Sequence, residues 1–170
     1  MNKLSITIFA LFLSTSGVLA QEYKYHPLFI YTFSKSIEWP SSSNNNDFTI
    51  CVVGSEQAYQ QMLSISQKKK MIKNQNLVVK KCKSLEEVGE SNIVFITKDT
   101  KVTSQEISER LSKSGILVIT EHRGMAEQGS HINFVATAGS KIGFELNTTS
   151  TQNAGLKVAS TLATLAIKTY

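Results

Sequence analysis

The sequence predicts a single α/β domain of three layers, with a mostly parallel central sheet, a C-terminal β-hairpin and flanking helices. Two observations lead to this prediction. Short apolar runs rich in β-branched residues alternate with segments of helical periodicity, which is typical of βαβ units. The chain has 170 residues, of which 41% are apolar, and this length and composition suit one compact core.

The first half of the chain shows the alternation most clearly. A helix is expected over 25–38, and it ends where Trp39 precedes Pro40, because proline disfavours a helical residue before it. A polar loop over 41–47 follows. The strands expected in the parallel part of the sheet cover 48–53, 77–81, 92–97 and 116–120. The helices expected among them cover 56–65 and 103–113.

The pattern changes after Thr120. A glycine-bearing loop over 121–130 leads to two strands, 132–136 and 141–146, whose short connection predicts a β-hairpin. From 149 to 167 the apolar residues recur at helical spacing, so one closing helix is expected.

The first twenty residues predict a secretory signal peptide. Lys3 gives a positive start, an apolar run of about ten residues follows, and small residues precede a cleavage site after Ala20. The run is shorter than the ~20 residues that span a bilayer. We therefore expect a domain over 21–170 that is exported without membrane insertion, and a retained signal anchor is the alternative.

Export makes the cysteines informative. Cys51 and Cys82 are the only two in the chain, and cysteines of exported proteins are usually paired. A Cys51–Cys82 disulfide would close a loop of about 32 residues and stabilise the fold by about 3–4 kcal/mol. A redox switch is the alternative, although no C-x-x-C motif supports it.

Motifs of the common enzyme classes are absent from the sequence, including the nucleophile elbow, the phosphate-binding loops and the zinc-protease helix. His122 and His131 could meet Glu121 or Glu127, but a metal site needs three or four converging ligands. Glu145 lacks a positioned second group for general-base work. We expect no enzyme activity, cofactor or metal, and a hydrolase that uses His122 or Glu145 is a distant alternative.

Lysines form the one dense charged patch, in a chain of net charge +5. Lys68, Lys69, Lys70 and Lys73 would suggest nucleic-acid binding in a cytosolic protein, but export and the lack of interleaved aromatic residues argue against it. A solvated helix end is the simplest interpretation. An acidic surface on a partner protein is the alternative.

Several short motifs, in this order and spacing, resemble the YfiR-like family over nearly the whole exported chain. They are YTFSKSIEWP (31–40), FTICVVG (48–54), INF (132–134), IGFELN (142–147) and AGLKV (154–158). In the family pattern Trp39 and Pro40 match the helix-ending motif, while Phe144, Glu145 and Asn147 match the late strand and the start of the last helix. The resemblance implies structural roles for these five residues.

The resemblance also implies a function. YfiR-like proteins are small exported α/β proteins, typified by a regulator that binds the periplasmic sensor region of an inner-membrane diguanylate cyclase and represses it. Cyclic-di-GMP signalling and biofilm formation fall as a result. A homodimer is expected by family analogy, and the lack of catalytic motifs fits a protein that needs only an interface.

Two surfaces are candidates for that interface. The loop over 121–131 offers Arg123, Met125 and His131, which combine charge, adaptable packing and hydrogen bonding. Lys69 and Lys70 of the lysine patch compete with it as an electrostatic docking site.

A small-molecule sensor that feeds a membrane receptor is the alternative function. In open α/β sheets, ligands bind at the carboxyl ends of the strands. Gly54, Ser55 and the segment 97–100 would line such a cleft.

Overall fold

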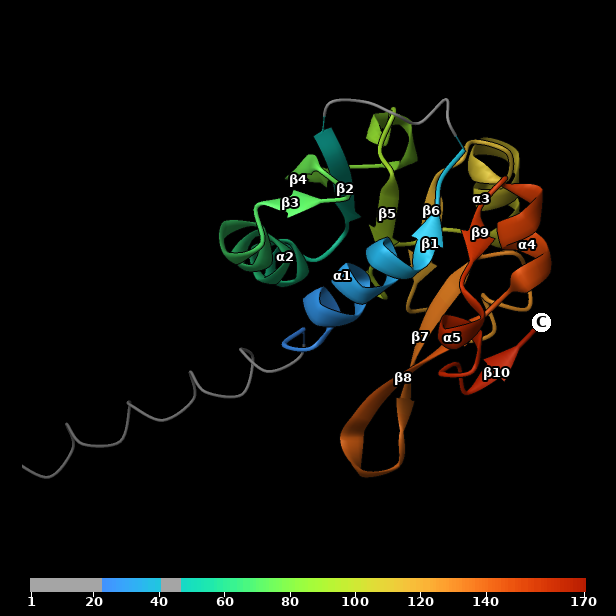
Figure 1. Ribbon diagram of the computed structural model, residues 1–170. Coiled ribbons are helices and arrows are strands. Elements are labelled where there is room, and N and C mark those ends of the chain that lie inside the picture. Colours follow the sequence, from blue (N-terminus) through green and yellow to red (C-terminus); the bar gives the residue numbers. More distant parts are fainter. Residues whose placement is uncertain (1–22, 41–46) are drawn as a thin grey trace, which may run out of the picture.

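The computed structural model describes residues 23–40 and 47–170 (Figure 1). The signal peptide expected over 1–20 and most of the loop expected over 41–47 lie outside the described residues. The rest forms a mixed α/β domain around one large sheet, as the sequence predicts.

The sheet has eight strands in the order β10-β8-β7-β6-β5-β2-β4-β3. Their bounds are β2 (Asp47–Val53), β3 (Met71–Ile72), β4 (Gln75–Cys82), β5 (Ile93–Ile96), β6 (Leu117–Thr120), β7 (Ile132–Thr137), β8 (Lys141–Leu146) and β10 (Lys168–Thr169). The five strands from β4 to β7 run parallel, whereas β3 pairs with β4, and β8 with β7, in antiparallel fashion. The predicted parallel sheet and hairpin are both present, and the short outer strands β3 and β10 are additions that the sequence pattern did not indicate.

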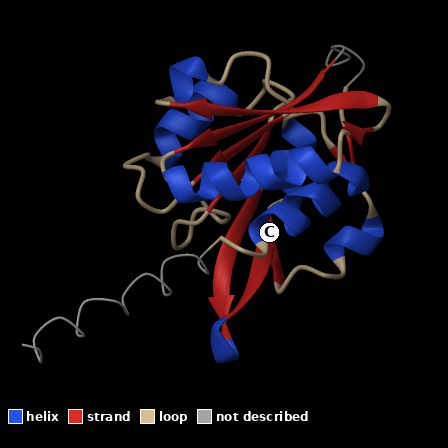
Figure 2. Ribbon diagram, turned by 90° about the vertical axis from the view of Figure 1, so that its left-hand side faces the viewer, coloured by secondary structure: helices blue, strands red, loops and turns tan. Residues whose placement is uncertain are grey.

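Helices cover both faces of this sheet. Helices α1 (His26–Ser36) and α2 (Glu56–Lys68) pack on one face, and α3 (Ser104–Leu111) packs on the other. The connections from β2 to β4 and from β5 to β6 run in opposite directions along the sheet, so right-handed crossovers place α2 and α3 on opposite faces. Figure 2 shows helices lying across the strands.

The strands alternate their side chains between two apolar clusters. In β5, Ile93 and Phe95 join the cluster beneath α1 and α2, while Val94 and Ile96 join the one beneath α3. Every residue of β5 is therefore buried, as expected for a central parallel strand.

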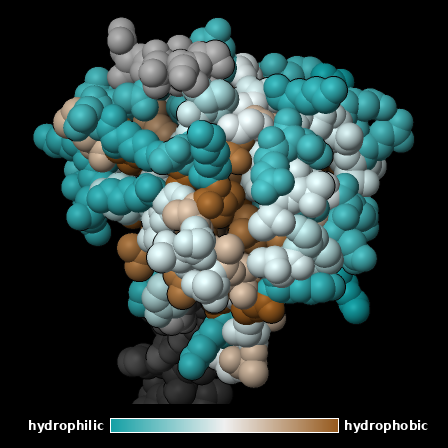
Figure 3. All heavy atoms as spheres, turned by 45° about the vertical axis from the view of Figure 1, so that its right-hand side comes forward, coloured by the Kyte–Doolittle hydropathy of each residue, from teal (hydrophilic) through white to brown (hydrophobic). Residues whose placement is uncertain are grey.

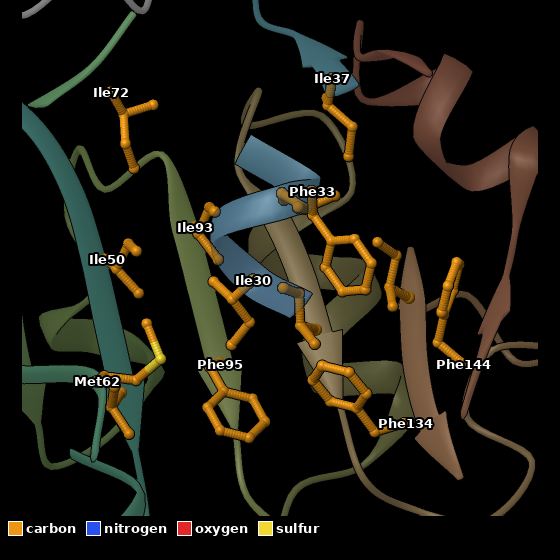
Figure 4. Packing of buried hydrophobic residues seen from close by; sticks show 14 of the residues in the cluster. Ile30, Phe33, Ile37, Ile50, Met62, Ile72, Ile93, Phe95, Phe134 and Phe144 are labelled. Atoms are coloured by element: carbon orange, nitrogen blue, oxygen red, sulfur yellow. The ribbon is translucent and has the colours of Figure 1, made fainter. Parts of the chain in front are cut away.

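Aromatic rings form the centre of the larger cluster. Phe33 of α1 stacks on Phe134 of β7, with 5.8 Å between ring centroids, and meets Phe144 of β8 edge-on at 4.9 Å (Figure 4). Burying each ring stabilises the fold by about 1.5–3 kcal/mol. This cluster fixes α1 over the β7–β8 hairpin.

The disulfide is present between Cys51 of β2 and Cys82 of β4, with 6.0 Å between their Cα atoms. Both cysteines are buried in the cluster beneath α3. The bridge therefore joins two neighbouring strands inside the core, where it is shielded from solvent.

The prediction of one closing helix over 149–167 is wrong. Helix α4 (Thr148–Asn153) ends at a left-handed Gly155, where Gly155 N–H donates to the Gln152 carbonyl and Leu156 N–H to the Thr151 carbonyl. This pair of bonds is a Schellman motif, which terminates helices. The chain continues through β9 (Lys157–Val158), α5 (Ser160–Ala163) and β10.

Strand β9 pairs in antiparallel fashion with β1 (Ile37–Glu38), the extended segment that follows α1. The apolar residues that imitate a helical stripe thus belong to several short elements. Leu156 and Leu162 are buried because these elements pack against α1 and the sheet.

Candidate functional site

The loop over 121–131 presents fewer side chains than the sequence suggests. Arg123 is exposed, but Met125 is only 6% exposed and His131 only 1%. Met125 packs in the cluster beneath α3. Because a partner can touch only exposed side chains, Arg123 is the member of this trio that is open to contact.

His131 is a buried structural residue. Its Nδ1 accepts a hydrogen bond from the Val118 N–H at 3.0 Å. Burial lowers the pKa of His131 to about 4, although a hydrogen bond with the Ile116 backbone opposes the shift. The ring is therefore neutral at neutral pH.

The other candidate metal ligands do not converge. His122 Nε2 lies 2.8 Å from the Thr100 carbonyl oxygen, and Glu121 pairs with His26 at 2.7 Å. Across residues 23–40 and 47–170, no three His, Cys, Asp or Glu side chains are placed to share a metal ion.

The cleft expected beside Gly54 is filled by neighbouring side chains. The Thr97 hydroxyl accepts the Ser55 N–H at 2.8 Å, and the hydroxyls of Thr97 and Thr100 both lie 3.2 Å from the Val53 carbonyl oxygen. A Cβ on Gly54 would lie 2.1 Å from each of these two hydroxyls. The threonines therefore pack against the end of β2 where the small-molecule hypothesis needs open space.

The family-motif residues occupy packing and capping positions. The Trp39 indole N–H donates to the Asn92 carbonyl at 3.0 Å, and its ring meets Phe48 edge-on. Asn147 caps α4 by accepting the Ser150 N–H at 2.7 Å, and its amide donates to the Ala126 carbonyl at 2.8 Å.

The other three motif residues also contact protein. Pro40 lies beside Gly155, 3.8 Å from where a Cβ on that glycine would stand. Phe144 is buried in the aromatic cluster, and the Glu145 carboxylate accepts a hydrogen bond from the Asn133 amide at 3.2 Å.

The structure reveals an apolar groove of about 400 Å³ that the sequence patterns did not indicate. We call it the apolar groove. It lies between α1, the β7–β8 hairpin and the segment from α5 to β10, and its lining residues are Leu28, Phe29, Thr32, Phe33, Thr137, Lys141, Ile142, Gly143, Phe144, Leu162, Leu165 and Ile167. Figure 3 shows apolar surface, coloured brown, gathered in a hollow on the face turned to the viewer.

Three large aliphatic side chains on this groove face solvent. Leu28 is 60% exposed, Leu165 66% and Ile167 57%. Single exposed apolar residues are common on protein surfaces, but a contiguous apolar depression marks an interaction site. The groove is therefore the strongest candidate for contact with a partner.

Local backbone geometry brings the walls of the groove together. The Ile167 N–H donates to the Phe144 carbonyl at 2.9 Å, which places β10 beside β8. Gly143 permits this approach, because a Cβ there would stand 3.0 Å from the Thr137 methyl and 3.1 Å from an Ile167 methyl. Gly143 could have indicated this feature from the sequence, because a glycine inside a predicted strand often marks a place where another backbone approaches closely.

A second, more polar pocket of about 280 Å³ adjoins the apolar groove and shares Lys141 and Ile142 with it. His26, Lys98 and Glu121 also line this pocket. The Glu121 carboxylate accepts hydrogen bonds from the Tyr23 hydroxyl and the Lys98 N–H, both at 3.2 Å. One end of the apolar groove is therefore bordered by charged side chains.

No helix within the described residues is long and apolar enough to cross a membrane.

Two of the solved structures that match illustrate the shared fold. The ABC domain in complex with L-Trp from Streptococcus pneumoniae has a TM-score of 0.58 at 11% identity, covering 82% of this chain and 59% of that one. A conserved domain protein from Vibrio cholerae O1 biovar El Tor has a TM-score of 0.53 at 10% identity, covering 88% and 60%. The chain thus spans about three fifths of each of these proteins, and identities this low show likeness of fold alone.

No curated protein matches the chain. The family model described as YfiR/HmsC-like matches residues 23–167, which includes every motif of the predicted resemblance and nearly all of the described domain. The chain belongs to the YfiR/HmsC-like family.

Proposed function

We propose that this protein binds the periplasmic sensor region of an inner-membrane diguanylate cyclase and represses it, which lowers cyclic-di-GMP signalling and biofilm formation. The family is one of periplasmic regulators of diguanylate cyclase signalling, and this supports the general role. The observation that carries the proposal is the apolar groove. Its exposed Leu28, Leu165 and Ile167 suit the buried centre of a protein interface.

Export is part of the proposal. We expect the leader over 1–20 to be removed after Ala20, so that the periplasmic protein begins at Gln21. The buried Cys51–Cys82 disulfide supports an oxidising compartment. Mass spectrometry of the protein recovered from the periplasm checks the cleavage site, and a chain that keeps its leader would contradict it.

The test of the partner uses Leu165, the most exposed aliphatic side chain of the groove. We expect Leu165→Asp to place a charge at the centre of the interface, weaken capture of the cyclase at least tenfold, and raise cellular cyclic-di-GMP. Thr164→Asp is the matched control. It adds the same charge at an exposed position that does not line the groove.

The readouts are cross-linking in living cells, with mass spectrometry of the trapped membrane proteins, and the cyclic-di-GMP level. Thermal melting of both variants shows that each is folded. If the Leu165→Asp protein still captures and represses the cyclase as the wild type does, the groove is not the interface. If deleting the whole protein lowers cyclic-di-GMP, the regulator activates its partner and the proposed repression is wrong.

A further inference from the structure

Five exposed lysines gather at the end of the domain where α1, α2 and the β3–β4 hairpin meet. We call this surface the basic face, and it consists of Lys35, Lys68, Lys69, Lys70 and Lys73 with the neighbouring Tyr31, Trp39 and Met71. Its lysines come from segments that are far apart in sequence, so tertiary packing assembles it.

Aromatic rings hold several of the lysines in place. The Nζ atoms of Lys35 and Lys69 lie 4.9 and 5.9 Å from the centroid of the Tyr31 ring. The Nζ of Lys73 lies 5.2 Å from the Trp39 ring and donates to the Ile37 carbonyl. The Tyr31 ring lies on α1 and the Trp39 ring follows it. Together they bring lysines from α1, the end of α2 and the hairpin onto one surface.

The charge of this surface is largely uncompensated among the described residues. In the part of the chain that the structure describes, no carboxylate forms an ion pair with Lys35, Lys68, Lys69 or Lys70. Partial burial lowers the pKa of Lys73, and the Glu38 carboxylate opposes that shift. The basic face is therefore a mainly positive surface, with Glu38 near Lys73.

An exposed apolar side chain follows Lys70 at the start of the β3–β4 hairpin. Lys73 and Asn74 both adopt left-handed φ angles, 49° and 66°, which form the tight turn of the β3–β4 hairpin. Ile72 points into the core, so the preceding Met71 points outward and is 52% exposed. Met71 thus exposes a flexible thioether directly after Lys70 in the chain, and such a side chain suits insertion among lipid headgroups.

We propose that the basic face docks the protein on the anionic phospholipid surface of the inner membrane. The lysines would meet lipid phosphates, and the exposed Met71 side chain would enter the interfacial layer. The surface is exposed, predominantly positive and spread over three elements. These features favour a lipid surface over an acidic protein.

Docking of this kind is compatible with a free apolar groove. Helix α1 directs Tyr31 and Lys35 towards the basic face and Leu28 and Phe29 towards the groove. A protein held on the membrane by the basic face would keep its groove available to a membrane-anchored partner. The inference goes beyond the proposed function and stands independently of it, because lipid binding needs no cyclase.

The experiment is co-sedimentation of the chain from Gln21 with vesicles that contain no protein. One set is phosphatidylcholine alone and the other contains about 30 mol% phosphatidylglycerol, and each is tested at low salt and at about 1 M NaCl, where the Debye length falls to about 3 Å. We expect binding only to the anionic vesicles, and expect the high salt to abolish it.

The variant Lys69→Glu with Lys70→Glu tests the surface, and Lys101→Glu with Lys113→Glu is its control. The control lysines are exposed on either side of α3 and change the net charge equally. We expect the first variant to lose about tenfold or more of its vesicle partitioning, and the control to keep most of it. All four positions are exposed, so melting temperatures should stay near that of the wild type.

Three results would overturn the inference. Equal losses in both variants would mean that net charge, not the basic face, drives binding. Unchanged partitioning of the Lys69/Lys70 variant would place the lipid contact elsewhere. Failure of the wild type to bind anionic vesicles, together with binding to poly-glutamate, would assign the face to an acidic protein. None of these results depends on whether the cyclase binds the groove.

Discussion

His131 illustrates how a polar residue becomes part of the core. The ring is buried between β6 and β7, and its Nδ1 accepts the Val118 N–H. Burial lowers its pKa to about 4 from the ordinary value of 6.5, which corresponds to about 3 kcal/mol between the two protonation states. The pKa of His131 is lower in the folded protein than in the unfolded chain, so protonation of the ring destabilises the fold. The stability that depends on the neutral ring is complete above about pH 6.5 and is lost as the pH falls towards 4.

We therefore expect His131→Asn to reduce the acid sensitivity of the fold. An asparagine oxygen can accept the Val118 N–H but does not titrate. Urea unfolding between about pH 7 and pH 4 should show the wild type losing about 3 kcal/mol more stability than the variant. Parallel pH profiles for the two proteins would show that His131 does not cause the acid sensitivity.

Elements of the first half of the fold follow the sequence closely. Parallel strands buried on both faces need long apolar runs. Gly54, directly after β2, and Gly115, in the turn between α3 and β6, both have positive φ angles. The chain after β8 does not follow the pattern, because Gly155 takes a left-handed conformation that ends α4. Apolar residues at helical spacing do not show whether one long helix or several short elements will bury them.

The disulfide links the neighbouring strands β2 and β4 covalently. We expect replacement of Cys51 and Cys82 by alanine to lower the free energy of unfolding by about 3–4 kcal/mol, because the unfolded chain loses its cross-link. Urea unfolding measures this loss. Dithiothreitol should weaken the wild type by a similar amount and leave the double variant unchanged, and an unaltered midpoint for the reduced wild type would contradict the expectation.

Residues 168–170 cover one edge of the large sheet. Strand β10 lies along β8, where the Tyr170 N–H donates to the Leu146 carbonyl at 2.9 Å. The Tyr170 carbonyl in turn accepts the backbone N–H of Thr148 at 2.9 Å and its hydroxyl at 2.7 Å. This short strand occupies hydrogen-bonding groups of β8 that would otherwise be available to another chain.

We expect removal of residues 168–170 to expose the edge of β8 and cause concentration-dependent association, measured by light scattering. The full-length variant Lys168→Ala with Thr169→Ala keeps the backbone of β10 and serves as the control. A truncated chain that stays dispersed like the control would show that β10 is not needed to protect this edge. The homodimer implied by the family stays a prediction, and sedimentation of the untruncated protein checks it.

Local periodicity, composition and motifs were enough to predict the α/β class, the order of the parallel strands along the chain, the cysteine pair and the family. The surfaces, in contrast, depend on tertiary packing. It buried Met125 and His131 inside a predicted docking loop, and it assembled the apolar groove and the basic face from separate segments. Exposure depends on what packs over a residue, and that neighbour usually lies far away in the chain.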